Sequence, residues 1–118
     1  MVRFDYYTEG DHSSQFEEWI RKLPPKDKIK LLATIHNIEQ YGLQIALRKE
    51  WVKKIDDEIW EIRSRFGNNI QRGPFFFAQG DLCIITHGFT KKTQKTPKSE
   101  INRAREIMKR YKENNHAH

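Results

Sequence analysis

Residues 59–66 read Ile-Trp-Glu-Ile-Arg-Ser-Arg-Phe, and this stretch decides the fold. Successive side chains of a β-strand point to opposite faces, so the even positions from Trp60 to Phe66 share one face and are apolar or small. Glu61, Arg63 and Arg65 share the other face, and all three are charged. The alternation predicts a strand that packs through one face and carries charge on the other.

Strand-like runs flank this stretch, and short polar segments with turn-forming residues separate them. The runs are residues 51–55, 70–77 and 82–89, and the separators are residues 56–58, 67–69 and 79–81. Because the separators are short, adjacent runs should pair as antiparallel hairpins. The central part of the chain is therefore predicted to form a meander.

Two helices are predicted before the meander. Ser14 and Glu17 have the spacing of a capping box, and the helix that they begin ends at Pro24-Pro25. A second helix follows over residues 26–42, with apolar residues on one face and a glycine as its stop. The two helices should form a hairpin, and residues 43–50 read as a less regular connection to the meander.

A last helix is predicted after the meander. Thr96 has the residue type of an N-cap, and Pro97 follows at the first helical position. The apolar stripe of this helix consists of Ile101, Ala104, Ile107, Met108 and Tyr111. Residues 114–118 are polar and are expected to form a frayed tail.

The whole chain, residues 1–118, reads as one α+β domain. Its length suffices for one hydrophobic core but not for two. Residues 2–6 alternate between apolar and polar types, which predicts an edge or near-edge strand at the start. We expect a twisted, mainly antiparallel sheet with the helices on one side of it.

The charge balance favours a polyanionic partner. The chain has 22 Lys+Arg against 16 Asp+Glu, a net charge of +6, and its pI is near 9.5. The one cysteine, Cys83, lies in an apolar run and reads as a small buried hydrophobe. No signal peptide and no apolar run of about 18 residues is present, so we expect a cytoplasmic protein with no membrane partner.

A basic run from His87 to Pro97 follows the last strand of the meander. Arg63, Arg65 and Arg72 precede it on the strands, so cations from strands and loop should converge. A solvated face, balanced by nearby acidic residues, is the alternative interpretation of the strand arginines. The lysines of the run, which all carry the same sign of charge, favour an anion site instead. They are Lys91, Lys92, Lys95 and Lys98.

The sequence disfavours metal or cofactor chemistry, since it has no phosphate-binding Gly-rich loop, no paired cysteines and no His pair at i and i+4. Cleavage of RNA needs none of these, because the substrate 2′-hydroxyl is the nucleophile and arginines can neutralise the phosphate. His87 is a candidate for proton transfer by its ordinary pKa, and a structural histidine at a turn is the alternative. A lysine among cations is another possible base, which makes Lys54, Lys91 and Lys92 candidates.

Several segments resemble the phage-derived branch of the RelE/HigB toxin superfamily. They are Ile59-Trp60-Glu61-Ile62-Arg63, Arg72, His87-Gly88-Phe89-Thr90-Lys91-Lys92-Thr93, Lys95-Thr96-Pro97, Glu100-Ile101 and Ala104. The resemblance implies a RelE-like fold and the toxin of a type II toxin-antitoxin module, which cleaves mRNA in the ribosomal decoding site. It also implies a cognate antitoxin, often with a helix-turn-helix domain, through which alone the toxin would meet operator DNA.

The resemblance, together with the residue types, assigns roles to particular residues. Arg65 and Arg72 would hold and neutralise the scissile phosphate, and Lys92 or His87 would assist proton transfer. The RNA-positioning residues would be Arg63, Lys91, Lys95 and Lys54. The chain departs from the family pattern at Gly73-Pro74, which predicts a bulge or an edge beside Arg72.

Two other functions remain open from the sequence. The same cations would serve a non-catalytic nucleic-acid-binding protein with a toxin-derived fold. They would also serve an adaptor that binds an acidic protein ligand. Cleavage of mRNA after induction separates the first hypothesis from both of these.

Overall fold

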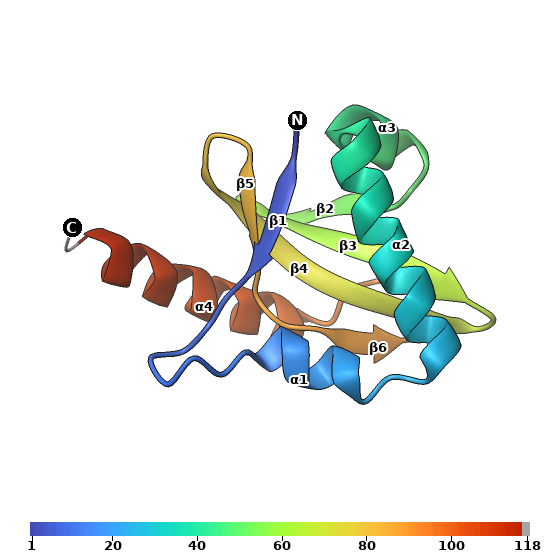
Figure 1. Cartoon of the computed structure of the whole chain (residues 1–118), viewed down its shortest axis with the longest axis horizontal. Helices are drawn as coiled ribbons and strands as arrows, with labels where there is room; N and C mark the ends of the chain where they lie inside the picture. The colour runs from blue at the N-terminus through green and yellow to red at the C-terminus, as the bar shows by residue number, and fades with distance from the viewer. Residues whose placement is uncertain (117–118) are drawn as a thin grey trace.

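The computed structural model describes residues 1–116 and confirms the α+β class (Figure 1). Within these residues, six strands form one sheet and four helices pack on it. In chain order the elements are β1 (Arg3–Tyr6), α1 (Gln15–Arg21), α2 (Pro25–Tyr41), α3 (Leu43–Arg48), β2 (Val52–Asp56), β3 (Ile59–Phe66), β4 (Asn69–Gln79), β5 (Leu82–Ile85), β6 (Phe89–Lys91) and α4 (Lys98–His116).

The sheet has the order β1-β5-β4-β3-β2, and β6 pairs with β4 as well. All pairs are antiparallel except β1 with β5, so the predicted meander and the predicted edge strand are both confirmed. The β3–β4 hairpin sets Arg63 opposite Arg72, which places the two side chains on the same face. At its turn Gly67 has φ +61°, a left-handed conformation that glycine adopts without strain.

The predicted single strand over residues 82–89 is wrong in one respect, because it is divided into β5 and β6. Both pair with the same edge of β4, with Ile85 opposite Phe75 and Phe89 opposite Arg72. Three residues, 86–88, therefore face only two, Gly73 and Pro74, and the extra residue makes a bulge. The bulge predicted beside Arg72 is confirmed.

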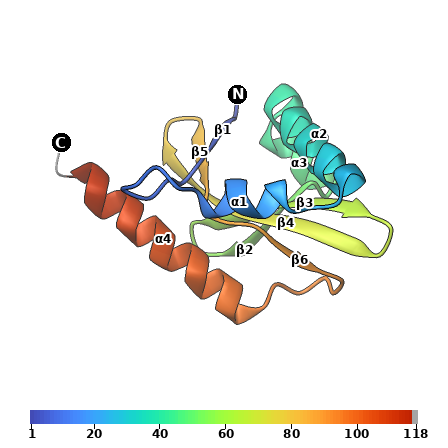
Figure 2. The ribbon, with the colours of Figure 1, turned by 60° about the horizontal axis from the view of Figure 1, so that its bottom comes forward.

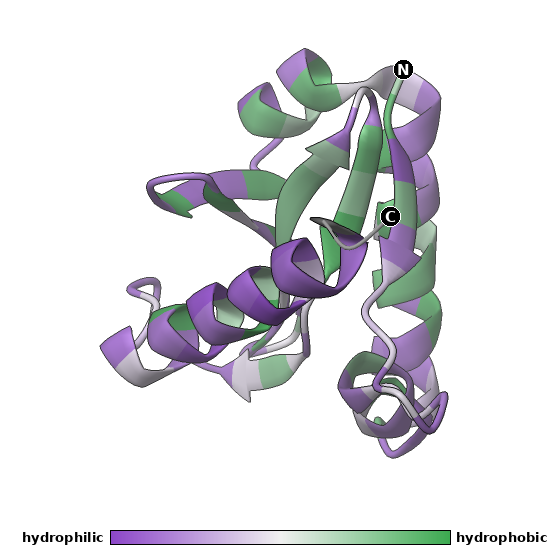
Figure 3. Cartoon of the chain, turned by 90° about the vertical axis from the view of Figure 1, so that its left-hand side faces the viewer, coloured by the Kyte–Doolittle hydropathy of each residue, from purple (hydrophilic) through white to green (hydrophobic). Residues whose placement is uncertain are grey.

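The helices lie on both faces of the sheet, which corrects the expectation that they share one side (Figures 1 and 2). Ile62 and Phe75 face the core shared with α1, α2 and α3, whereas Ile59 and Phe76 face the core shared with α4. Each central strand is apolar on both faces in this region, so other elements must pack on both faces to shield them from water. In Figure 3 the hydrophobic residues of α4 turn toward the sheet, and its outer side is hydrophilic.

Local signals located the first two helices well. The Ser14 side chain accepts a hydrogen bond from the Glu17 backbone N–H, as the capping-box spacing predicts. Gly42 ends α2 with φ +89°. The connection over residues 43–50, however, is not irregular: its first six residues form α3.

The last helix also departs from expectation in detail. It continues to His116, so residues 114–116 belong to it rather than to a tail, and residues 117 and 118 lie outside the described part. Its predicted stripe is confirmed, with Ala104, Ile107 and Met108 buried. No helix within residues 1–116 is both long enough and apolar enough to cross a membrane.

Candidate nucleic-acid interface

The first part of the charged face of β3 is not solvated, because Glu61 is buried there, whereas Arg65 further along the strand is exposed. Glu61 and Arg72 both have 0% exposure, and the Arg63 side chain is 10% exposed. Glu61 Oε1 lies 2.7 Å from Arg63 Nε and 3.6 Å from Arg72 Nη1. One carboxylate thus faces two guanidinium groups, and this cluster keeps one net positive charge.

The loop between β6 and α4 covers the cluster. The Gln94 carbonyl accepts hydrogen bonds from Arg63 Nη2 at 2.8 Å and from Arg72 Nη1 at 3.0 Å. The Thr96 hydroxyl donates to the Glu61 carboxylate, at 3.0 Å from Oε2. The prediction that Thr96 caps α4 is therefore wrong, because its hydroxyl binds Glu61. The helix begins one residue later than predicted, and the Pro97 carbonyl accepts a hydrogen bond from the Ile101 N–H in its first turn.

Arg72 does not reach the surface. Burial lowers the pKa of its guanidinium, and the neighbouring Glu61 carboxylate opposes that shift. Its Nε and Nη2 find no hydrogen-bond partner within residues 1–116, and its guanidinium lies 6.0 Å from the centre of the Phe89 ring. The predicted contact of Arg72 with a phosphate would require the loop around Gln94 to move away.

His87 is also fully buried. Its Nε2 lies 3.0 Å from Glu100 Oε1, and its Nδ1 lies 2.9 Å from the Thr86 hydroxyl. Burial lowers the pKa of His87 to about 4 despite the Glu100 carboxylate, so the ring is neutral at pH 7. A neutral ring that donates from Nε2 and accepts at Nδ1 satisfies both contacts. Of the two roles that the sequence left open, this geometry favours the structural one.

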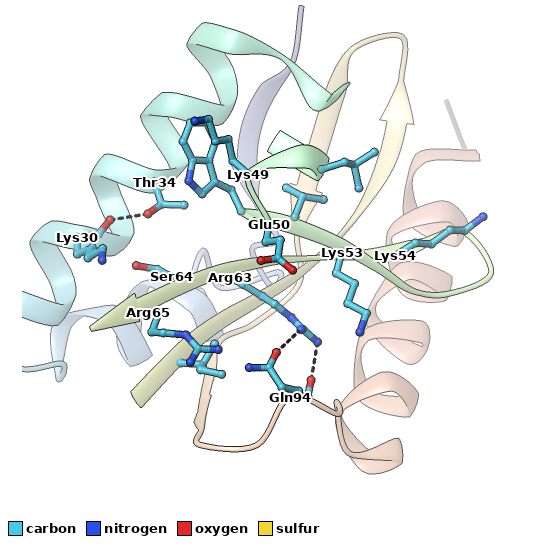
Figure 4. A pocket seen from close by; sticks show the side chains of 14 residues that line it. Lys30, Thr34, Lys49, Glu50, Lys53, Lys54, Arg63, Ser64, Arg65 and Gln94 are labelled. Atoms are coloured by element: carbon cyan, nitrogen blue, oxygen red, sulfur yellow. Dashed lines mark hydrogen bonds between the residues drawn. The ribbon is translucent and has the colours of Figure 1, made fainter. Parts of the chain in front are cut away.

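A basic pocket opens beside the cluster, at the beginning of β2, where β3 extends beyond its pairing with that strand (Figure 4). The last backbone hydrogen bond between them runs from the Arg63 N–H to the Trp51 carbonyl at 2.8 Å. The pocket has a volume of about 540 Å³, which is the size of a small-ligand site. Six cations and one carboxylate, that of Glu50, line it. The cations are Lys30, Lys49, Lys53, Lys54, Arg63 and Arg65.

The pocket combines walls from four elements of the fold. Lys30 comes from α2, Lys49 from the end of α3, and Lys53 from β2, while Arg63 and Arg65 come from β3. Like charges converge here although they repel one another, and a bound polyanion would relieve that repulsion. The arrangement suits phosphate groups.

The structure brings some predicted site residues together and separates others. Lys54, Arg63 and Arg65 line the pocket, as predicted. Lys91, Lys92 and Lys95 are exposed on β6 and the loop after it, but they do not line it. The sequence interpretation missed Lys30, Lys49, Lys53, Glu50 and Gln94. The charged residues within the run 49–54 could have indicated a basic site there, whereas nothing in the sequence spacing placed Lys30 beside them.

The comparison with protein families found one match. The family model described as "Phage derived protein Gp49-like (DUF891)" matches residues 18–109, which is well over half of the chain. The chain belongs to this family of Gp49-like phage-derived proteins. A search of the curated proteins found no match. The phage-derived part of the resemblance is therefore confirmed, and its assignment to the RelE/HigB superfamily stays a prediction.

Proposed function

We propose that this protein is the toxin of a type II toxin-antitoxin module, a ribosome-dependent endoribonuclease that cleaves mRNA. The observation that carries the proposal is the convergence of six cations on one pocket of nucleotide size. Membership in a phage-derived family and the resemblance to RelE/HigB toxins support it. The partners would be mRNA, the ribosome and a cognate antitoxin that carries the contact with operator DNA.

Cleavage at this pocket needs no added nucleophile. The 2′-oxygen of the substrate attacks the adjacent phosphorus, the bond from phosphorus to the 5′-oxygen breaks, and a 2′,3′-cyclic phosphate and a 5′-hydroxyl result. The protein must neutralise the charge that builds on the phosphate, and a planar guanidinium does this well. Arg65 is the accessible arginine for that task, since Arg72 is buried.

Two protons must also move during the reaction. The first leaves the 2′-hydroxyl, and the second reaches the departing 5′-oxygen. Lys54 lines the pocket, with its Nζ 5.4 Å from the centre of the Trp60 ring, whereas Lys92 is exposed outside it and His87 is buried. In Figure 4 the Lys54 ammonium points away from Arg65, so Lys54 would have to turn toward the pocket to transfer a proton, and Lys92 requires movement of its loop.

The test is to induce the protein in bacteria and map mRNA 5′ ends, with and without the product of a neighbouring helix-turn-helix gene. Arg65→Ala should slow cleavage roughly 10- to 100-fold, because the remaining cations share the neutralisation of the phosphate. Arg3→Ala is the matched control, since Arg3 is exposed at the far edge of the sheet and pairs with Asp81. If induction of the unaltered protein generates no new mRNA 5′ ends, the proposal is wrong.

One observation favours a non-catalytic alternative. Two of the four predicted catalytic residues, Arg72 and His87, have 0% exposure, and in this alternative the accessible cations serve binding alone. A binding protein would retain RNA with a steep salt dependence but would leave the RNA intact. Arg65→Ala would then reduce the salt slope and would change no 5′ end. An adaptor for an acidic protein would bind neither RNA nor ribosomes.

A further inference from the structure

Glu50 occupies a backbone position that usually belongs to glycine. It follows α3 with φ +62°, in the left-handed region that L side chains rarely adopt. The Trp51 N–H bonds to the Ala46 carbonyl at 2.9 Å, and the Glu50 N–H bonds to the Leu47 carbonyl at 3.2 Å. These two bonds define a Schellman motif, in which glycine is the favoured residue at the left-handed site. The sequence places a carboxylate there instead.

The Glu50 side chain faces the basic pocket, together with Lys49, Lys53 and Arg63 (Figure 4). It is exposed, and within residues 1–116 it forms neither a salt bridge nor a side-chain hydrogen bond. A pocket that bound phosphate alone would gain nothing from an acidic group, since like charges repel. The carboxylate therefore indicates that part of the ligand donates hydrogen bonds.

The remaining walls of the pocket suit a flat, apolar ring with polar edges. Leu47, Trp51 and Val52 line the pocket, and Trp51 is half-buried. Ser64 also lines it; this residue is 2% exposed, and its hydroxyl has no hydrogen-bond partner among the described residues. A buried hydroxyl normally has a hydrogen-bond partner, and a polar group of a bound ligand would supply one for Ser64.

We propose that the pocket binds one unpaired nucleobase of a single-stranded nucleic acid, and that Glu50 selects bases that carry an amino group. The amino group of cytosine, adenine or guanine would donate to the Glu50 carboxylate, while the base packs against Trp51. Uracil presents a carbonyl oxygen in place of the amino group of cytosine, and two acceptors repel. The flanking phosphates lie on Lys53 and Arg65. This inference rests on the proposed function, because it names the substrate feature that the same pocket reads.

The test compares fluorescently labelled six-nucleotide 2′-deoxy probes of cytosine, of uracil and of abasic sites, with affinity measured by anisotropy at pH 7.5 and low salt. The 2′-deoxy probes lack the nucleophile, so binding is measured without cleavage. We expect the cytosine probe to bind about 5- to 100-fold more tightly than the uracil probe. The abasic probe should bind most weakly, because it lacks a ring to stack on Trp51.

Glu50→Gly is the decisive variant, since glycine suits the left-handed backbone and the fold should be retained. It should remove the preference for cytosine, and it should raise affinity for the uracil probe because one repelling carboxylate is lost. Glu58→Gly is the matched control. Glu58 has nearly the same backbone conformation, φ +61°, but it lies at the β2–β3 turn and pairs with Lys112. This control should keep the full preference.

Equal binding of the three probes would overturn the inference and would leave the proposed cleavage standing. Loss of RNA cleavage in Glu50→Gly with an unchanged preference for cytosine would also overturn it, because Glu50 would then act on protons and not on the base. A preference that depends on Glu50 in a protein that generates no new mRNA 5′ ends would support the inference, and only the proposed function would fail.

Discussion

Replacement of Glu61 by glutamine should destabilise the fold far more than replacement of an exposed glutamate. Glu61 has 0% exposure, and its carboxylate faces Arg63, Arg72 and the Thr96 hydroxyl at 2.7, 3.6 and 3.0 Å. Glutamine keeps the shape but removes the charge, so the fully buried Arg72 loses its counter-ion. Breaking a buried pair in this way costs about 3–5 kcal/mol. That loss is a large part of the roughly 5–15 kcal/mol that stabilises a domain.

The assay is urea denaturation followed by far-UV circular dichroism, which gives the free energy of unfolding by linear extrapolation. Glu58→Gln is the matched control, because the Glu58 side chain is 58% exposed and its pair with Lys112 is screened by water. The control should cost no more than about 1 kcal/mol. A double variant, Glu61→Gln with Arg72→Met, removes both buried charges and should be more stable than Glu61→Gln alone.

Two results would refute this reasoning. If Glu61→Gln costs less than about 1 kcal/mol, the carboxylate does not compensate the buried guanidinium. If the double variant is no more stable than Glu61→Gln, then the cost comes from lost packing or from Thr96, and not from an unpaired charge on Arg72.

The remaining predictions concern the bulge between β5 and β6. The pKa of His87 is about 4 in the fold and about 6.5 when unfolded, so its contribution to stability is complete above pH 6.5 and is lost as pH falls toward 4. The loss should reach about 3 kcal/mol, measured by urea denaturation from pH 7.5 to 4, and titration of the ring near pH 6.5 by NMR would contradict this. Gly88→Ala should destabilise by at least about 1–3 kcal/mol, since a Cβ there would lie 1.9 Å from Trp19 Cε3. Gly10→Ala, which has nothing within 4 Å, should change the melting temperature little, and equal effects of the two substitutions would exclude the steric cause.

Local patterns predicted the elements well because their causes are local. The alternation over residues 59–66 gave β3 with its observed bounds, and Ser14 gave the start of α1. The division between β5 and β6 depends on how residues 86–88 fit against Gly73 and Pro74 in another strand. The sequence predicted a bulge there but not that it would interrupt the strand.

The cover on each face of the sheet was harder to predict. Alternation shows which side chains share a face, but not what packs on that face. Glu61, Arg63 and Arg65 share one face, yet Glu61 is buried, Arg63 is nearly so and Arg65 is exposed. The difference arises because the loop that contains Gln94, about 30 residues further along the chain, closes over the first two of them. Such a contact leaves no periodic signal.

The pocket shows the same limit for function. Arg63 and Arg65 were predicted because they share the charged face of one strand, and Lys54 was predicted because it lies among other cations. Lys30 and Glu50 lie on α2 and at the end of α3, and they reach the pocket only through the packing of these helices. Lys91 and Lys92 are close to each other in sequence, and for that reason they were predicted to belong to the site, although they do not line the pocket.

Arg63 connects the buried cluster with the pocket. Its Nε binds Glu61, its Nη2 binds the Gln94 carbonyl, and its side chain also lines the pocket with Gln94. These bonds fix the guanidinium before any ligand arrives, so little side-chain entropy is lost when a phosphate binds. The cluster also holds two guanidinium groups against one carboxylate, which leaves a net positive charge next to the pocket. The burial of Arg72 is thus compatible with a role in anion binding, through the charge that it adds beneath the site and the loop carbonyl that it holds in place.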